Sequence, residues 1–405
     1  MVRRAPLFLV YRVPMGRFEI NLWCYPWDLV DEGVDRVLDR LRGEAGVSGI
    51  SVATHYHGVD QLRPHAGVSP RRFRSAGGAQ FQPDAGAYVA TRYRPAVAEW
   101  LRKSDPLAAI GEACTKRDLL LRAWHVCMHG AAAVERYPAG AVKDAFGEVN
   151  PSWLCPSNLD VRELLRAMVA DLSGRYPFDS IELEQVGFPN DLHSHAHPKT
   201  GFPCGEAGDW LRSLCFCESC RQMASRDGVD TEAAAAAARR HLERIFATGE
   251  PLHVGPADLA ADEPTLIGYV DWRCRQVTSL VQLVRSSCRC RLVVHRDGNR
   301  VWAGADYAAI ASHCDALMPI CYGDDPGGLE AAVAEAAAEV GGVDRVEVGL
   351  SACTPPCADS AALVASVKKV VELGVRSVNI YHYGLIPERR LEWIRQASRY
   401  ARREA

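Results

Sequence analysis

The sequence predicts an α/β protein with the (β/α)8 architecture of a TIM barrel. Short apolar or β-branched runs alternate with longer amphipathic or alanine-rich stretches along the whole chain, and this unit recurs eight times. With 405 residues, the chain is long enough for one large barrel with insertions. A doubly wound open sheet would also alternate, but it usually has fewer strands, and no glycine-rich phosphate turn follows the first run. We therefore expect a single barrel domain over residues 1–405.

Hydrophobic patterning gives the individual elements. The first predicted helix, for example, places Val34, Leu38 and Leu41 on one face at helical spacing. The strands are predicted at residues 18–23, 49–55, 119–127, 180–186, 291–295, 316–322, 345–351 and 377–383. The helices are predicted at residues 29–42, 106–116, 161–172, 266–286, 307–313, 329–340, 361–373 and 388–401.

Two predicted connections are too long to be plain loops. Residues 58–118 join the second and third strands, and residues 187–290 join the fourth and fifth. The second connection contains an insertion, residues 187–265, with the His-rich stretch HSHAHPKTG, a cysteine cluster and a run of six alanines typical of a helix. Long connections of this kind are often lids or subdomains, and in a barrel they would lie over the face where the strands end.

The composition argues against several classes of partner. The chain is 48% hydrophobic and 24% charged with a formal net charge of −3, which is ordinary for a globular protein. A near-neutral balance gives no field that attracts polyanions, so we expect neither nucleic acid nor a membrane as partner. No window approaches the ~20 apolar residues that span a bilayer, and a cytoplasmic protein is expected. Most of the fifteen cysteines would then be buried thiols.

Two glutamates on the fourth predicted strand are the strongest catalytic candidates. Because side chains alternate along a strand, Glu182 and Glu184 would point into the barrel while Ile181 and Leu183 face the helices. Close like charges raise one pKa, so Glu184, nearer the strand end, is expected to be the general acid and Glu182 its partner. In the alternative interpretation, one or both glutamates bind an inward Arg or Lys and only pack the barrel interior.

The other predicted strand ends are rich in aromatic rings and imidazoles. Five of the eight strands place a His at or just after the expected active face. Aromatic platforms with acids and imidazoles suit a polar, ring-shaped ligand such as a sugar. The expected base or nucleophile is Asp297 or Asp324. The expected substrate-binding residues are Trp23, His55, His57, Trp124, His125, His295, Tyr322, Tyr381 and His382.

Residues 150–184, NPSWLCPSNLDVRELLRAMVADLSGRYPFDSIELE, resemble the region around the fourth strand of glycoside-hydrolase-like (β/α)8 proteins. Those proteins have a Cys-Pro and Asn-Pro-type turn, a helix and an Asp-Gly-Ile-x-Leu-Asp/Glu strand. The acidic pattern falls on Asp179, Glu182 and Glu184. Ser180 replaces the usual Gly, and Val186 stands where chitinase-like members carry the catalytic Glu, so the resemblance does not carry over the chitinase mechanism. Glu347 lies within the seventh predicted strand, not at its end, where a nucleophile would be expected.

The segment LCFCESC gives the sharpest cysteine signal. Cys-x-Cys-x-x-Cys with one further ligand can close a tetrahedral thiolate site, which zinc usually occupies. The predicted ligands of such a structural zinc are Cys204, Cys215, Cys217 and Cys220. Buried thiols without a metal, and a redox or cluster role, are the alternatives. Similar Cys-Phe-Cys-x-x-Cys segments follow the same strand in uncharacterised glycoside-hydrolase-like barrels, and that resemblance implies a scaffold role.

The favoured prediction is a glycoside-hydrolase-like enzyme that acts on a glycoside or a sugar-bearing small molecule through carboxylate acid/base chemistry. The sequence has no Walker loop, dinucleotide fingerprint or nucleophile elbow, so no organic cofactor is expected. One alternative is a metal-dependent hydrolase, lyase or isomerase that uses His55, His57, His125 and His295. A second alternative is a barrel that binds carbohydrate without catalysis. A further histidine group, which could bind a metal or form a substrate lid, consists of His193, His195 and His197.

Overall fold

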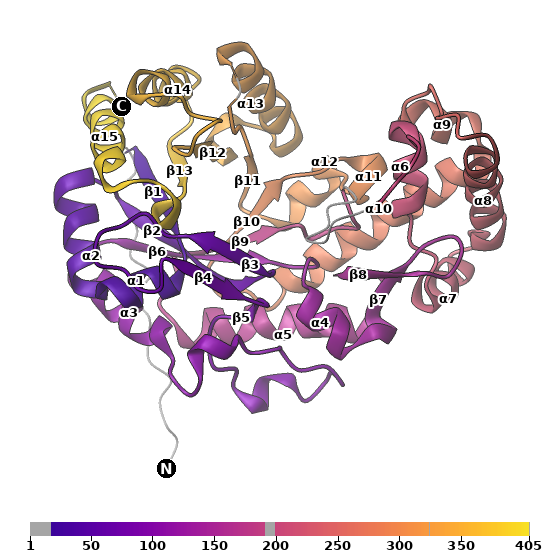
Figure 1. Ribbon diagram of the computed structural model, residues 1–405, viewed down its shortest axis with the longest axis horizontal. Helices are drawn as coiled ribbons and strands as arrows, with labels where there is room; N and C mark the ends of the chain where they lie inside the picture. The colour runs from indigo at the N-terminus through magenta and orange to yellow at the C-terminus, as the bar shows by residue number, and fades with distance from the viewer. Residues whose placement is uncertain (1–17, 191–198, 324, 405) are drawn as a thin grey trace.

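The computed structural model describes residues 18–190, 199–323 and 325–404. Within these ranges, eight parallel strands follow one another in chain order around a barrel (Figure 1). They are β1 (Glu19–Cys24), β2 (Gly49–Tyr56), β6 (Leu120–Val126), β9 (Ser180–Glu184), β10 (Arg291–Arg296), β11 (Ala316–Pro319), β12 (Val348–Ser351) and β13 (Ser377–Tyr381). The predicted (β/α)8 fold is confirmed, and each of these strands overlaps the range predicted for it.

The barrel closes between β11 and β12, where the pairing is thinnest. Its other neighbouring strands form parallel ladders. At the closure, isolated bridges join Leu317 to Val346 and Ile320 to Gly349. The Glu347 N–H donates a hydrogen bond to the Leu317 carbonyl at 3.0 Å.

Helices surround the strands and bury the main hydrophobic core against their outer faces. The predicted helix over residues 29–42 is divided at Gly33, whose φ of +89° is incompatible with a continuous helix. Its parts are α1 (Pro26–Glu32), α2 (Val34–Arg40) and the π-helical turn η1 (Leu41–Ala45). The other outer helices are α3 (Pro106–Lys116), α5 (Leu159–Arg175), α10 (Pro264–Arg285), α12 (Tyr307–Ile310), α13 (Pro326–Val340), α14 (Ser360–Glu372) and α15 (Leu391–Glu404). Short turns of 3-10 helix are η5 (Ala311–His313), η6 (Val343–Arg345), η7 (Tyr383–Leu385) and η8 (Glu388–Arg390).

Long connections follow β2, β6 and β9, of which the one after β6 was not predicted from the sequence. The first contains β3 (Val59–Leu62), β4 (Arg72–Ser75), β5 (Gly78–Ala79), η2 (Ala85–Tyr88) and η3 (Glu99–Leu101). The second contains α4 (Ala131–Arg136), η4 (Pro138–Gly140) and a hairpin of β7 (Ala141–Lys143) and β8 (Val149–Leu154). The third contains α6 (Gly205–Ser213), α7 (Glu218–Arg226), α8 (Thr231–Thr248) and α9 (Pro256–Asp262).

The helices of the third connection gather on one side of the barrel, at the right of Figure 1. There α8, which contains the predicted alanine run, packs against α6, α7 and α10. The short helix α11 (Arg300–Ala303) follows β10 and contacts both α9 and α10. In the part of the chain that the structure describes, no helix has the length and apolar character needed to cross a membrane.

Candidate functional site

Glu182 lies deep in the barrel interior and its carboxylate is fully paired. Its hydrogen-bond donors include Trp23 Nε1 (2.9 Å), Ser51 Oγ (2.9 Å) and Asn379 Nδ2 (2.7 Å). Arg122 Nε lies 2.8 Å from Glu182 Oε1. Burial raises the pKa of Glu182, but the charges of Arg122 and His295 outweigh burial and lower the pKa to about 2. Glu182 is therefore ionised, and its environment matches the alternative interpretation in which an inward Arg binds one of the two glutamates.

Arg122 also joins Glu182 to a second interior carboxylate. Its Nη2 donates a hydrogen bond to Glu347, and Arg291 Nη2 contacts the other oxygen of Glu347 at 3.0 Å. Glu347 thus lies below the barrel mouth as part of an ion-pair network. The sequence predicts an inward Arg or Lys partner without identifying it, although Arg122 stands out as a charged residue within the apolar strand LLRAWHV.

Glu184 occupies the end of β9 at the mouth of the barrel. The Trp124 indole N–H donates a hydrogen bond to its carboxylate, and His295 Nδ1 lies 4.0 Å from Glu184 Oε2. About 21% of the Glu184 side chain is exposed. Burial raises the pKa of Glu184, and the negative charge of Glu182 adds to this, whereas His295 and Trp124 act in the opposite direction. Glu184 is the glutamate of the pair that is open to a ligand.

Asp297 follows β10 and lies on the same face of the chain as His295. Its Oδ2 accepts a hydrogen bond from the Gln185 backbone N–H at 2.6 Å, and its carbonyl accepts one from Asn190 Nδ2 at 2.6 Å. Burial raises the pKa of Asp297 to about 7, with a further contribution from the negative charge of Glu184, against the effect of His295. Two carboxyl groups that interact electrostatically and both titrate above their usual range thus lie together at the barrel mouth.

Aromatic rings line the interior beside these carboxyl groups. The Tyr322 and Tyr381 ring centroids are 5.4 Å apart, and each lies about 6 Å from the Trp23 ring, at 6.3 and 6.2 Å. Trp23 and Trp124 are almost completely buried, whereas 36% of Tyr322 is exposed. Tyr322 therefore offers a ring surface to a ligand, and the Trp23 ring packs against it.

The expected placement of His55 and His125 differs from the observed one. The register shifts between Ala53 and His55, and this bulge turns His55 away from the barrel interior. His55 instead lines a small cavity together with residues of α5 such as Leu164 and Met168, and its Nδ1 is 2.6 Å from the Val126 carbonyl oxygen. His125 is paired with His55 in the sheet register and lies on the same outer side, opposite to Trp124. Burial lowers the pKa of both imidazoles.

The remaining predicted histidines are also dispersed. His57 stacks between Tyr56 and His129, at centroid distances of 4.1 and 4.7 Å. His382 is buried, 3.9 Å from the Tyr25 ring, and burial lowers its pKa. The four imidazoles of the metal-dependent alternative, those of His55, His57, His125 and His295, do not form one of the potential metal-binding groups found among the described residues. Asp324 and the histidines of the HSHAH stretch lie outside the described residues.

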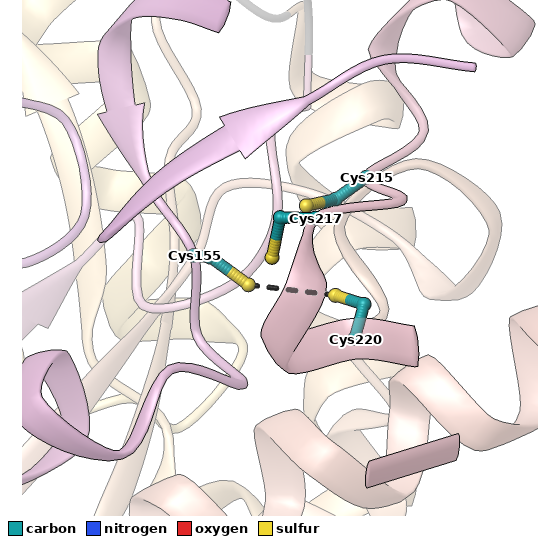
Figure 2. Close-up of side chains that lie close together, drawn as sticks. All are labelled: Cys155, Cys215, Cys217 and Cys220. Carbon is teal, nitrogen blue, oxygen red and sulfur yellow. Dashed lines mark hydrogen bonds between the residues drawn. The ribbon is translucent and has the colours of Figure 1, made fainter. Parts of the chain in front are cut away.

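The cysteine prediction needs one correction. The sulfurs of Cys155, Cys215, Cys217 and Cys220 lie within 4.8 Å of one another, and all four residues are buried (Figure 2). Cys204 is not in this cluster, because its Sγ lies beside Arg212 Nη1 at 4.0 Å. The true fourth member follows β8 in the preceding connection, some sixty residues away in sequence from the other three. In the sequence, Cys155 stands in the Cys-Pro turn of the family resemblance, and spacing alone does not connect it with the other three cysteines.

The fold and the site together define a (β/α)8 barrel protein with two carboxyl groups at the mouth. No protein-family profile and no curated protein matches the sequence. Among solved structures, the chain is similar to α-L-fucosidase isoenzyme 2 from Paenibacillus thiaminolyticus, with a TM-score of 0.55 and 12% identity over 95% of this chain and 49% of that chain. It is also similar to an endo-1,4-β-mannanase from Rhizomucor miehei, with a TM-score of 0.50 and 10% identity over 96% of each chain.

These similarities show the fold alone, because the identities are so low. The protein shares its (β/α)8 barrel fold with these two proteins, and it spans about half the length of the fucosidase chain that it matches.

Proposed function

We propose that the protein is a glycoside hydrolase that cleaves a glycoside or a sugar-bearing small molecule, with Glu184 and Asp297 as its acid/base pair. The observation that carries this proposal is the pair itself: two neighbouring carboxyl groups at the barrel mouth whose pKa values are both raised, that of Asp297 to about 7. Similarity of the fold to a fucosidase and a mannanase supports the reaction class.

The charges favour one distribution of roles. A carboxyl group with a pKa of about 7 is protonated in about half of the molecules at neutral pH, far more than an ordinary carboxyl group, so Asp297 is suited to protonate the glycosidic oxygen as the bond to the leaving group breaks. Glu184, whose carboxylate accepts a hydrogen bond from the Trp124 indole N–H, would be the ionised partner. It would either remove a proton from the attacking water or attack the anomeric carbon itself. In this assignment Asp297 is the general acid and Glu184 is the base or nucleophile, the reverse of the roles predicted from the sequence.

Tyr322 and Tyr381 would form the sugar platform. A pyranose ring presents a face of C–H groups that packs well on an aromatic ring, and Tyr322 is the more exposed of the two. His295 lies beneath these rings, with its Nε2 3.4 Å from Glu182 Oε2. Because His295 lies between Glu182 and Glu184, it couples the charge of Glu184 to that of the buried Glu182. Glu182 would then act as a positioning residue.

The test is a screen of the purified protein against aryl glycosides and oligosaccharides, followed by the variants Glu184→Gln and Asp297→Asn. We expect each variant to keep the far-UV circular dichroism of the wild type and to lose at least 100-fold in kcat/KM. Glu372→Gln, an exposed carboxylate at the end of α14, which leads into the amino end of β13, is the matched control and should keep wild-type activity.

Normal turnover in both site variants would overturn the assignment of the pair. Binding of sugars without any turnover of the panel would overturn the hydrolase proposal and leave the carbohydrate-binding alternative. The configuration of the product, measured by NMR, would decide between the two roles of Glu184: retention follows from attack on the sugar, and inversion from activation of water.

A further inference from the structure

We propose that Cys155, Cys215, Cys217 and Cys220 bind one structural zinc ion, which clamps the β7–β8 hairpin to the insertion that follows β9. This inference is independent of the proposed hydrolase activity, because the cluster lies in the connections outside the barrel strands.

The positions of the sulfurs fit a tetrahedral thiolate site. The four sulfurs converge on one point from two separate chain segments (Figure 2), and Cys155 Sγ lies 3.5 Å from Cys220 Sγ. Zinc–sulfur bonds of about 2.3 Å in a tetrahedron place the sulfurs about 3.8 Å apart, close to this separation. A disulfide would require about 2.05 Å. Since all four residues are buried, the site offers no open position for water, as is typical of a structural zinc centre.

The charge around the cluster fits a metal–thiolate complex better than four neutral thiols. A zinc ion with four thiolates carries a net charge of about −2. Two buried arginines, Arg162 and Arg273, interact electrostatically with the sulfurs, and neither pairs with a carboxylate within the described ranges. Their guanidinium groups bond backbone carbonyls instead: Arg162 Nη1 contacts Pro156 O at 3.1 Å, and Arg273 Nη1 contacts Val301 O at 2.9 Å. Two unpaired buried cations would balance the charge of the complex.

The cluster is also where the two connections are joined. Cys155 lies between β8 and α5, whereas the other three cysteines lie between α6 and the first turn of α7. Beside the cluster, Phe216 N–H donates to Lys143 O at 2.6 Å, and Asn158 Nδ2 donates to Ser219 Oγ at 3.0 Å. A metal bound here would stabilise the contact between the connection after β6 and the connection after β9. Metal binding and the local folding of these two connections would therefore be linked.

The metal content of the purified protein tests the proposal. We expect close to one zinc per chain by elemental analysis, and X-ray absorption with four sulfurs at about 2.3 Å. Cys155→Ser should lose most of this zinc. Cys204→Ser, a buried cysteine of the same insertion outside the cluster, is the matched control and should keep it. If Cys155→Ser does not fold, titration of the wild type with a mercurial reagent replaces it, and zinc release should follow modification of four thiols.

Several results would overturn the proposal. These are protein purified without metal, loss of zinc in Cys204→Ser but not in Cys155→Ser, and a Cys155–Cys220 disulfide found by mass spectrometry of the unreduced protein. Iron in place of zinc would overturn the identity of the metal. Because none of these readouts uses catalysis, failure of the zinc proposal and failure of the hydrolase proposal are distinguishable.

Discussion

Arg122 and Glu182 form an ion pair in the barrel interior, with 2.8 Å between Arg122 Nε and Glu182 Oε1 and at most 2% of either side chain exposed. Through hydrogen bonds to Glu182, this pair reaches side chains on β1, β2 and β13. One buried carboxylate is thus held from five strands besides its own, since Arg122 belongs to β6 and His295 of β10 approaches it as well.

Removing one partner of this pair should strongly destabilise the fold. Arg122→Met leaves Glu182 as a buried charge without its guanidinium and Glu347 with Arg291 as its remaining partner, and we expect a loss of about 3–5 kcal/mol in the free energy of unfolding. Denaturant unfolding followed by tryptophan fluorescence measures it. Arg72→Met, which breaks an exposed pair with Asp60, should leave the midpoint unchanged. Equal midpoints for the two variants would show that the interior pair contributes little.

Asp297 should make stability depend on pH. Its pKa in the folded protein, about 7, lies above the ordinary value of 3.8, so ionisation is easier in the unfolded chain. Its favourable contribution is therefore complete below about pH 4 and is lost as the pH rises to about 7. Asp297→Asn should gain stability relative to the wild type across this range, by up to about 4 kcal/mol for three pKa units. A difference that does not vary between pH 4 and 8 would contradict the raised pKa.

Trp124 should set the acid limb of the pH–rate profile. Its indole N–H lowers the pKa of Glu184, so Trp124→Phe should raise that pKa and move the acid limb upward by about one pH unit. Because the two carboxyl groups interact, the profile reports pKa values of the pair. Trp100→Phe loses a similar hydrogen bond, to Gln80, and should leave the limb in place. Equal profiles for the wild type and Trp124→Phe would remove Trp124 from this role.

Tyr322 should contribute to substrate binding more than to the chemical step. Tyr322→Ala removes the exposed ring and should raise KM up to about tenfold with a smaller change in kcat, whereas Tyr322→Phe keeps the ring and should behave like the wild type. Phe146→Ala removes another exposed ring in a different part of the chain and serves as control. If Tyr322→Ala lowers kcat with KM unchanged, the platform assignment is wrong.

The barrel could be predicted from sequence because its signal is local. Each strand is a short apolar run, and each outer helix has its own amphipathic pattern, so eight strands were placed within a few residues. The connection after β6 was missed because its hairpin is short and partly exposed, with burial decided by contacts to other connections. Gly33 divides a helix through its positive φ, which hydrophobic spacing does not reveal.

The site was less predictable because it depends on contacts distant in sequence. Alternation predicted that Glu182 and Glu184 face the barrel interior, as the structure places them, but the charges of these glutamates and of Asp297 depend on Arg122 and His295 from other strands. One extra residue in β2 turned His55 outward, an effect that strict alternation excludes. Cys155 joins its cluster through tertiary folding, so spacing alone selected the nearer Cys204.

The thin closure between β11 and β12 has a consequence for the dynamics of the barrel. Its few hydrogen bonds include Glu347 N–H to Leu317 O and Cys321 N–H to Gly349 O, at 3.0 and 2.8 Å. Every other junction is a ladder of at least four paired positions. Opening here breaks the fewest bonds, so amide hydrogens along this junction should exchange with deuterium before those elsewhere in the barrel. The barrel behaves as a curled sheet whose two edges meet at the junction between β11 and β12, and Tyr322 lies directly beside this junction.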